Sequence, residues 1–480
     1  MEAEKVSQDQ LHTSRQGRYA LAADRHRPLY HFVNPEGQAM PFDPNGNVFW
    51  RGRHHMGYIY QERGVHFWGH VSSLDLLHWR HHRPALFPTD DSPENGIFSG
   101  NGFVDKDGSR VIFLYHGTNA GNSIATSGDA NLDDWQKLPA NPIIPNPEEG
   151  EEKPYRSWDP CGWIEGDTYY GLFGGQRPAI FRAKQLDAWE YVGDLFAHGI
   201  EGVGIDEDVS CPDLFKMGDK WVLVCISHRL GCRYYVGDWK NEQFYPEYHE
   251  MMTFADNEYF APESYTDEQG RRILFTWVFD GRAEEVRNGS GWSGTMGLPR
   301  VLELGSDNRL IMTPVEELER LRYNEKSLEN VVVPADGEVG VEFDAVEPNA
   351  VELEVEFAPT GAGEYGVRVC ASPDREEETV IGYDAGAGKL GIDTRRSGLG
   401  QEKKAVEAAP LPLGDGEGLK LRIFVDKSIV EVFANDGRLV LSRRVYPERE
   451  DSTGISLFAQ GGEVRGEGVR IWDVMPTNPY

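Results

Sequence analysis

The stretch Leu74-Asp75-Leu76-Leu77-His78-Trp79 is the first of a series of related aspartate–tryptophan segments. The series continues at Leu132-Asp133-Asp134-Trp135, Leu186-Asp187-Ala188-Trp189 and Gly237-Asp238-Trp239, and Gly291-Trp292-Ser293-Gly294 extends it without the aspartate. The five tryptophans are 56, 54, 50 and 53 residues apart. A period of about 50 residues is typical of one four-stranded propeller blade and exceeds most helical repeats. Five such units predict a five-bladed β-propeller.

The sequence between the tryptophans consists of short strand-like runs. Residues 111–115 (VIFLY), 169–173 (YYGLF) and 221–226 (WVLVCI) are rich in β-branched and aromatic residues and are bounded by Gly, Asp or Asn. Short runs of this kind, separated by turn residues, are typical of an all-β fold. We therefore expect residues 27–322 to form the propeller, after an N-terminal extension at residues 1–26.

The pattern changes after residue 312. Thr313-Pro314-Val315-Glu316 has an N-cap threonine, a proline at the first helical position and a glutamate at the third, which predicts a short helix. Strict alternation of apolar and polar residues then appears in residues 351–357, 419–423 and 429–433. Alternation with a period of two indicates half-buried strands. Residues 323–480 are therefore predicted to form a separate C-terminal β-sandwich with a structural role.

The charge and composition exclude several classes of partner. The 480 residues include 48 Lys and Arg against 79 Asp and Glu, which gives a net charge of −31. Such a field repels nucleic acids and anionic membranes, so neither is expected as a partner. The first ten residues are charged and lack the apolar run of an export signal, and five cysteines without metal-type spacing suit a reducing compartment. We therefore expect a cytoplasmic protein, and the sequence leaves its oligomeric state open.

Polar residues occur at similar distances before each tryptophan. They lie 29 to 36 residues upstream, each in a turn-rich motif, and are Asp43, Ser99, Asp159, Asp208 and Glu263. The inner strands of a propeller converge on its axis, so we expect these side chains to meet in one funnel. Two carboxylates on either side of a bond are what glycoside hydrolysis requires.

A set of motifs follows in a fixed order along nearly the whole chain. They are Arg27-Pro28-Leu29-Tyr30-His31-Phe32, Asp43-Pro44-Asn45-Gly46, Tyr60-Gln61, Trp68-Gly69-His70, Phe98-Ser99-Gly100, Cys211-Pro212-Asp213, Leu298-Pro299-Arg300 and the segment from Asp426 to Gly437. Each motif alone is weak, but the ordered set is specific. With these motifs the chain resembles a known family, glycoside hydrolase family 32, the β-fructofuranosidases.

The resemblance implies catalytic roles and also shows departures. Asp43 matches the family's nucleophile, although Phe42 replaces the asparagine that normally precedes it. Asp159 matches the aspartate that stabilises the transition state, with Trp158 in place of the usual arginine. The family's acid/base glutamate is replaced by Ser210, whose hydroxyl cannot protonate a leaving alkoxide near neutral pH.

Three explanations for the missing acid remain open. Asp208 is two residues before Ser210, would share its face on a strand and can supply the proton; Arg156 stands in the same relation to Trp158. Alternatively, Glu263 reaches the axis from the fifth blade, with its pKa raised by neighbouring acids. In the third explanation, the protein binds sugar but hydrolyses it poorly, or uses a pre-activated leaving group.

The predicted sugar site combines aromatic and polar side chains. Its expected members are Gln61, Trp68, Phe98, Ser99, Arg156, Trp158 and Ser210. The resemblance implies a retaining glycoside hydrolase that cleaves sucrose or fructo-oligosaccharides by double displacement, with no cofactor or metal. The alternatives are fructosyl transfer, hydrolysis of another furanoside, or a carbohydrate-binding protein with impaired catalysis.

Overall fold

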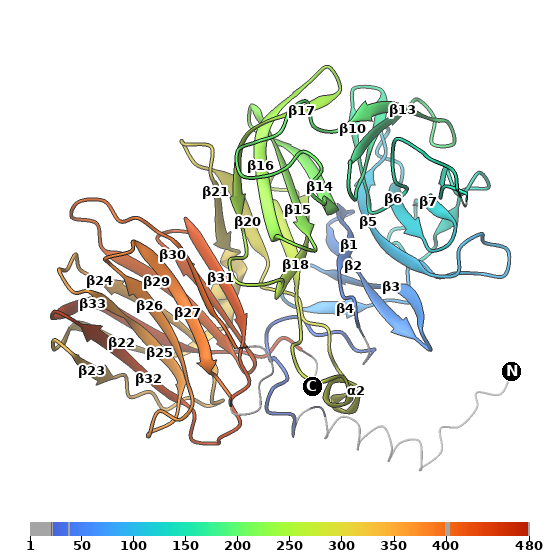
Figure 1. Ribbon diagram of the computed structural model, residues 1–480. Coiled ribbons are helices and arrows are strands. Elements are labelled where there is room, and N and C mark those ends of the chain that lie inside the picture. Colours follow the sequence, from blue (N-terminus) through green and yellow to red (C-terminus); the bar gives the residue numbers. More distant parts are fainter. Residues whose placement is uncertain (1–20, 22, 37–38, 149, 399–403, 479–480) are drawn as a thin grey trace, which may run out of the picture.

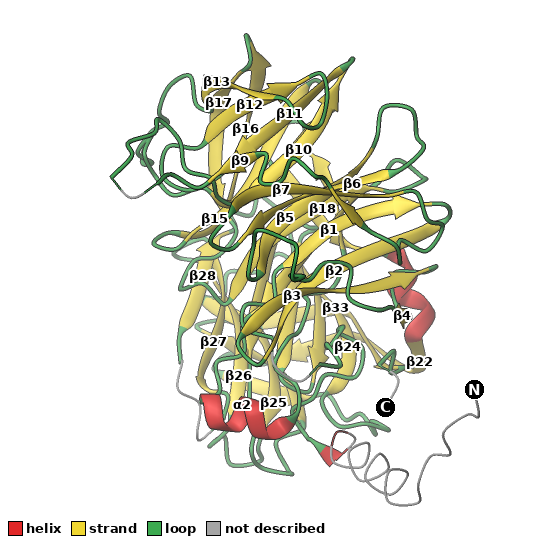
Figure 2. Ribbon diagram, turned by 90° about the vertical axis from the view of Figure 1, so that its right-hand side faces the viewer, coloured by secondary structure: helices red, strands yellow, loops and turns green. Residues whose placement is uncertain are grey.

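The computed structural model describes residues 21, 23–36, 39–148, 150–398 and 404–478. In this part of the chain an N-terminal β-propeller packs beside a C-terminal β-sandwich (Figure 1). Strands dominate both units, and helix α2 (Glu284–Ser290) is one of few helical segments (Figure 2). The prediction of an all-β chain with a five-bladed propeller followed by a sandwich is confirmed.

Each of the five blades is built on four antiparallel strands that neighbour one another in chain order. Blades one and two contain β1 (Pro44–Trp50), β2 (Arg53–Glu62), β3 (Val65–Ser73), β4 (Trp79–His81), β5 (Ile97–Val104), β6 (Val111–Gly117), β7 (Gly121–Ser127) and β8 (Gln136–Lys137), with β9 (Ile144–Pro145) added beside β7. Blades three and four contain β10 (Pro160–Glu165), β11 (Thr168–Phe173), β12 (Ala179–Ala183), β13 (Trp189–Asp194), β14 (Ser210–Met217), β15 (Lys220–Ser227), β16 (Gly231–Lys240) and β17 (Gln243–Met251). Blade five contains β18 (Tyr259–Thr266), β19 (Arg272–Val278), β20 (Arg300–Leu304) and β21 (Leu310–Pro314).

The first strand of each blade forms the hub of the propeller. Strand β1 contacts β5 and β18, and the ring is completed by contacts of β10 with β5 and β14 and of β14 with β18. Glycines allow the close approach between β1 and β5, because a Cβ added at Gly102 would lie 2.9 Å from the backbone of Gly46. Residues at the beginnings of these five strands are therefore brought to one end of one axis.

The repeated tryptophans mark a local turn. The indole nitrogens of Trp135 and Trp189 donate to the carbonyls of Leu132 and Leu186, three residues earlier, at 2.7 and 2.8 Å. Trp79 and Trp189 begin the fourth strands of their blades, and Trp135 directly precedes one. Trp239 instead lies in the third strand of blade four, and Trp292 lies between β19 and β20. The series thus predicts the number of blades correctly, although its last two members are not structurally equivalent to the first three.

The hub strands are irregular where the polar residues lie. The antiparallel register shifts between Ser210 and Asp213 in β14 and between Phe260 and Glu263 in β18, with comparable shifts in β1 and β5. A β-bulge of this kind turns a side chain away from simple alternation and is common next to active sites.

The sandwich consists of two six-stranded sheets. One sheet has the order β22 (Arg322–Val333), β33 (Val464–Val474), β24 (Ala350–Phe357), β29 (Leu419–Asp426), β30 (Ile429–Ala434) and β31 (Leu439–Arg444). The other has the order β23 (Gly337–Gly340), β32 (Gly454–Gln460), β25 (Glu364–Ala371), β26 (Glu378–Asp384), β27 (Lys389–Arg396) and β28 (Val406–Pro410). Their inner faces enclose one aliphatic core.

The prediction that Thr313 caps a short helix is wrong, although a short helix does follow. Thr313 lies within β21 and pairs with Val301, so its backbone is extended and its side chain does not cap a helix. A short 3₁₀-helix, η1 (Glu316–Leu321), follows instead, with Val315 at its N-cap and no side-chain cap. Leu318 and Leu321 are buried, so tertiary packing places the turn a few residues later than the capping pattern indicates.

Buried ion pairs join the two units. Asp426 accepts hydrogen bonds from the backbone nitrogens of Leu29, Tyr30 and His31 at 2.7 to 2.9 Å, and its Oδ2 lies 2.9 Å from Nδ1 of His31. Glu431 pairs with Arg300 of the propeller at 3.0 Å. The segment from Asp426 to Gly437 therefore binds the sandwich to the propeller through buried polar contacts.

Candidate active site

Two predicted catalytic carboxylates meet at the hub. Asp43 directly precedes β1, Asp159 directly precedes β10, and both lie beside Cys211, the second residue of β14. The Cys211 sulfur is 3.6 Å from Oδ2 of Asp43 and 3.7 Å from Oδ2 of Asp159. Burial raises the pKa of the Cys211 thiol well above its usual value, and both carboxylates raise it further. A neutral thiol therefore separates the two acids.

Asp43 is held so that one of its oxygens has no hydrogen bond. Ser99 Oγ donates to Asp43 Oδ2 at 2.7 Å, whereas Oδ1 is buried without a hydrogen-bond partner among the described residues. The side chain of Asn45 donates to the Asp43 carbonyl at 2.7 Å and accepts from the nitrogen of Gly100 at 2.8 Å. These bonds tie the segment before β1 to β5 and fix the direction of the carboxylate.

Asp159 shares the same buried environment. Its Oδ2 accepts a hydrogen bond from the backbone nitrogen of Cys211 at 2.9 Å. Burial raises the pKa of Asp159 to about 6, and the charge of Asp43 contributes in the same direction. Burial also raises the pKa of Asp43, while hydrogen bonds from Ser99 and Cys211 and the charge of His228 lower it. The pH must therefore exceed the pKa of Asp159 before both acids are ionised.

Asp208 lies in the loop before β14 rather than on a strand. Its Oδ1 accepts a hydrogen bond from Ser210 Oγ at 2.9 Å, so the two side chains do meet, as their spacing predicts. Its Oδ2 accepts from the backbone nitrogen of His228 at 3.1 Å and lies 2.7 Å from His228 Nδ1. Although burial alone would raise it, the pKa of Asp208 is lowered by these bonds from His228 and Ser210. Asp208 is therefore an ionised acceptor with both oxygens in use.

Glu263 lies in β18 and contacts β1, the strand that follows Asp43. Its side chain is buried, and its Oε1 accepts a hydrogen bond from the backbone nitrogen of Asn47 at 3.2 Å. Burial, together with the charge of Asp213, raises the pKa of Glu263 well above its usual value. The neutral form of Glu263 is therefore favoured, and its carboxyl group supports the backbone of β1.

This arrangement predicts how Glu263→Gln changes stability. A folded-state pKa raised above the unfolded value of 4.5 gives a stability contribution that is present below that value and is lost as the pH rises. A glutamine remains neutral, so the melting temperature of Glu263→Gln should exceed that of the wild type by a margin that grows to a few degrees between about pH 5 and about pH 8. A margin that does not change with pH would show that Glu263 is ionised in the folded protein.

Aromatic side chains form one wall beside these acids. Phe98 and Trp158 are partly buried with ring centroids 6.2 Å apart, and the Arg156 guanidinium lies 3.9 Å from the centre of the Trp158 ring. Gln61 donates to the carbonyl of Met40, three residues before Asp43. Phe98, Arg156 and Trp158 therefore lie on the segments that carry Ser99 and Asp159, and Gln61 of β2 contacts the segment that leads to Asp43.

The prediction that Trp68 lines the sugar site is wrong. Trp68 is fully buried, and its ring packs edge-on against Phe113 and Tyr115 of the neighbouring blade. Its indole nitrogen donates to the carbonyl of Phe98 at 3.0 Å. Trp68 therefore acts through packing between blades and through the position of Phe98, without a face available to a sugar.

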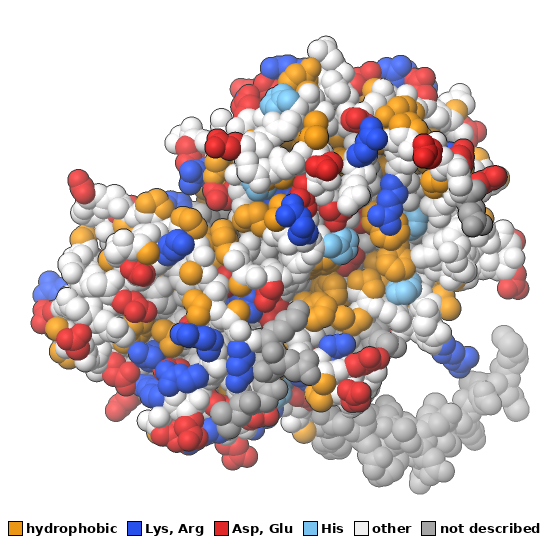
Figure 3. All heavy atoms as spheres, viewed as in Figure 1, with side chains coloured by type: hydrophobic (Ala, Val, Ile, Leu, Met, Phe, Trp, Pro, Cys, Tyr) orange, Lys and Arg blue, Asp and Glu red, His pale blue; other side chains and the backbone are white. Residues whose placement is uncertain are grey.

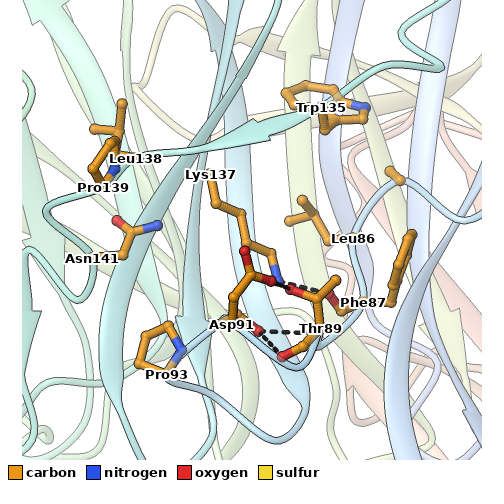
Figure 4. A pocket seen from close by; sticks show the side chains of 12 residues that line it. Leu86, Phe87, Thr89, Asp91, Pro93, Trp135, Lys137, Leu138, Pro139 and Asn141 are labelled. Carbon is orange, nitrogen blue, oxygen red and sulfur yellow. Dashed lines mark hydrogen bonds between the residues drawn. The ribbon is translucent and has the colours of Figure 1, made fainter.

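A cavity of about 540 Å³ adjoins Asp208, and it is lined by Arg156, Gln176, Asp206, Glu207, Asp208, His228 and Arg229. On the face of the molecule in Figure 3, acidic side chains are spread over both units, and hydrophobic and histidine side chains are exposed together near its middle. Another hollow, of about 560 Å³, is seen in Figure 4 between the segment after β4 and strand β8. The only carboxylate that lines the hollow of Figure 4 is Asp91, which accepts a hydrogen bond from Thr89 Oγ1 at 2.7 Å. The hollow of Figure 4 therefore lacks the pair of acids that glycoside hydrolysis requires.

One group of side chains in the described ranges brings metal-ligand atoms together, His70, His82 and Asp133. The two imidazole rings are stacked with centroids 4.3 Å apart and planes 23° apart. Because the nitrogen lone pairs lie in the ring planes, nearly parallel stacked rings do not direct them at one ion. This group does not fit a metal site.

Comparisons with known proteins place the chain in a family. Residues 31–314 match the Glycosyl hydrolases family 32 N-terminal domain, and residues 317–473 match the Glycosyl hydrolases family 32 C terminal domain. The chain therefore belongs to glycosyl hydrolase family 32.

Individual relatives agree with this assignment. A levanase of Bacillus subtilis is 33% identical over 94% of this chain and 72% of its own length. A sucrose-6-phosphate hydrolase of Escherichia coli is 28% identical over 98% of this chain and its own full length. The crystal structure of fructan 1-exohydrolase IIa from Cichorium intybus superposes with a TM-score of 0.84 at 22% identity, covering 94% of this chain and 98% of that one.

Two residues at the site carry no prediction from the sequence. Cys211 belongs to the Cys211-Pro212-Asp213 motif, which predicts no role for its thiol, yet the thiol contacts both acids. His228 lies in the turn between β15 and β16, away from every motif, and meets Asp208 only through folding.

Within the described residues, no helix has the length and apolar character needed to cross a membrane.

Proposed function

We propose that this protein hydrolyses β-fructofuranosidic bonds, in sucrose or fructo-oligosaccharides, with retention of configuration. The observation that carries the proposal is that Asp43 and Asp159 lie beside the same sulfur atom, and that one buried oxygen of Asp43 has no hydrogen-bond partner in the part of the chain that the structure describes. The names of the relatives, levanase and sucrose-6-phosphate hydrolase, support the fructosyl group as the part of the substrate that is recognised.

The reaction proceeds by double displacement. Asp43 Oδ1 attacks the anomeric carbon of the fructosyl unit, forming an ester to the enzyme as the leaving alcohol departs with a proton. Asp159 stabilises the positive charge that develops on the sugar ring. Water then attacks the same carbon, loses a proton to a base and releases Asp43, so that two inversions give net retention.

The direct test follows the first product formed from sucrose by NMR. We expect β-fructofuranose to appear before its other anomers, together with an equal amount of glucose. Initial release of the α-anomer would contradict the retaining mechanism, and cleavage of an arabinofuranoside without cleavage of any fructoside would contradict the substrate class. An excess of glucose over fructose would instead indicate fructosyl transfer to another sugar as the main reaction.

A further inference from the structure

The proposed reaction needs a proton donor on the leaving-group side, and the expected glutamate is absent. The donor cannot be Ser210, whose hydroxyl already donates to Asp208. Asp208 is ionised and accepts hydrogen bonds at both oxygens, and Glu263 is buried against β1 and does not line the cavity beside Asp208. None of the three holds an available proton facing the cavity.

His228 also lines this cavity, and its side chain is both anchored and exposed. Its Nδ1 lies 2.7 Å from Asp208 Oδ2, its backbone nitrogen donates to the same oxygen, and its side chain is 67% exposed. The ring of Phe260 packs edge-on against it at 5.9 Å between centroids. The bond at Nδ1 fixes the ring and leaves Nε2 without a hydrogen bond to any described residue, so Nε2 is free to meet a substrate.

The charges around His228 favour its protonated form. The acidic groups facing it are Asp208, Asp159, Asp43, Asp206 and Glu207, and the basic groups are Arg156 and Arg229. The hydrogen bond with Asp208 raises the pKa of His228, and the charges of Asp208, Asp159 and Asp43 raise it further against the opposing effect of burial. Conversely, the charge of His228 lowers the pKa of both Asp43 and Asp159. The three side chains therefore belong to one electrostatic unit.

We propose that His228, oriented by Asp208, is the general acid and base of this site, an inference that rests on the proposed function. In the first step His228 Nε2–H gives its proton to the glycosidic oxygen while the bond to the anomeric carbon breaks and Asp43 forms the ester. In the second step the neutral imidazole takes a proton from the attacking water, the ester bond breaks, and His228 returns to its charged form. No oxidant, metal or other reactant is required.

The replacement at position 210 fits this assignment. A glutamate there would place another carboxylate beside Asp208, where two like charges oppose each other. Serine instead donates a hydrogen bond to Asp208, whose second oxygen then orients His228. The loss of the usual acid and the presence of the aspartate–histidine pair are therefore parts of one arrangement.

The test compares a poor and a good leaving group in His228→Gln. We expect kcat/KM for sucrose to fall by on the order of 10² to 10⁴-fold, whereas kcat/KM for p-nitrophenyl β-fructofuranoside changes by less than about tenfold, because nitrophenolate leaves without protonation. On the nitrophenyl substrate, kcat of His228→Gln should be limited by attack of water on the ester, which needs the general base. Azide needs no general base, so it should restore kcat and yield β-fructosyl azide. The basic limb of the wild-type pH profile for sucrose should disappear in His228→Gln and move to lower pH in Asp208→Asn.

The matched control is His78→Gln. His78 is exposed and bonded through Nδ1 to Asp75 at 2.9 Å, which repeats the aspartate–histidine pair far from the hub on the loop before β4. Its kinetics should equal those of the wild type. Unchanged sucrose turnover in His228→Gln, with full loss in Asp208→Asn, would overturn the inference and make Asp208 the acid itself. A wild type inactive on both fructosides would instead refute the proposed function.

Discussion

Asp43→Asn is expected to lower kcat/KM for sucrose and for p-nitrophenyl β-fructofuranoside alike, by on the order of 10⁴-fold or more. The amide is not nucleophilic, so neither leaving group can be displaced to form the ester. The hydrogen bond from Ser99 and the packing around Cys211 can persist with little change in shape. Loss on both substrates distinguishes this variant from His228→Gln, and initial-rate kinetics with the two substrates measures it.

The same substitution should stabilise the protein. Burial raises the pKa of Asp43, so its ionised form costs folding free energy at neutral pH, and an amide removes that cost. The melting temperature of Asp43→Asn should therefore exceed that of the wild type at neutral pH, with the difference shrinking as the pH falls and Asp43 becomes protonated. Asp90→Asn, at an exposed position, should alter neither property. An active Asp43→Asn would remove Asp43 from the mechanism, and a variant destabilised at neutral pH would contradict the folding cost assigned to the buried charge of Asp43.

The sequence predicts the number of blades because the turns that mark the blades are formed by residues close together in the chain. The segments ending at Trp135 and Trp189 close a turn within four residues, and for this reason their spacing reveals the number of blades. Trp292 has the same spacing without the same turn, because the segment with α2 is inserted between β19 and β20. A period in the sequence thus predicts the number of blades correctly even though Trp239 and Trp292 lie at different places in their blades.

The site is less predictable, because its contacts join segments that are distant in the chain. Trp68 lies in a motif near the active centre, yet only the packing of neighbouring blades decides that its ring is inaccessible. Asp208 and Glu263 are both acids near the hub, but their roles differ because one meets His228 and the other meets the backbone of Asn47. Residue type and spacing do not determine these partners; the loop geometry at the hub does.

Glu431→Gln is expected to destabilise the protein by about 3–5 kcal/mol, the cost of leaving buried charges without their partner. Glu431 is fully buried at the junction of the two units, where Oε1 lies 3.0 Å from Arg300 and Oε2 lies 3.9 Å from His31 Nε2. Burial alone would raise its pKa, but Arg300 and His31 outweigh burial and lower the pKa of Glu431 to about 2. Its contribution is therefore present above the unfolded value of 4.5 and is lost as the pH falls towards about 2.

Urea unfolding of Glu431→Gln at neutral pH and at about pH 3 measures this effect, and the loss should be smaller at the lower pH. Asp436→Asn is the control, because its pair with Lys420 is exposed and 3.5 Å long, so its removal should cost less than about 1 kcal/mol. The double variant Arg300→Met/Glu431→Leu should lose less stability than the sum of the losses in the single variants Arg300→Met and Glu431→Leu. The reason is that the double variant leaves neither member of the pair as an uncompensated charge. Equal losses in Glu431→Gln and Asp436→Asn, or strict additivity in the double variant, would show that this ion pair does not hold the sandwich against the propeller.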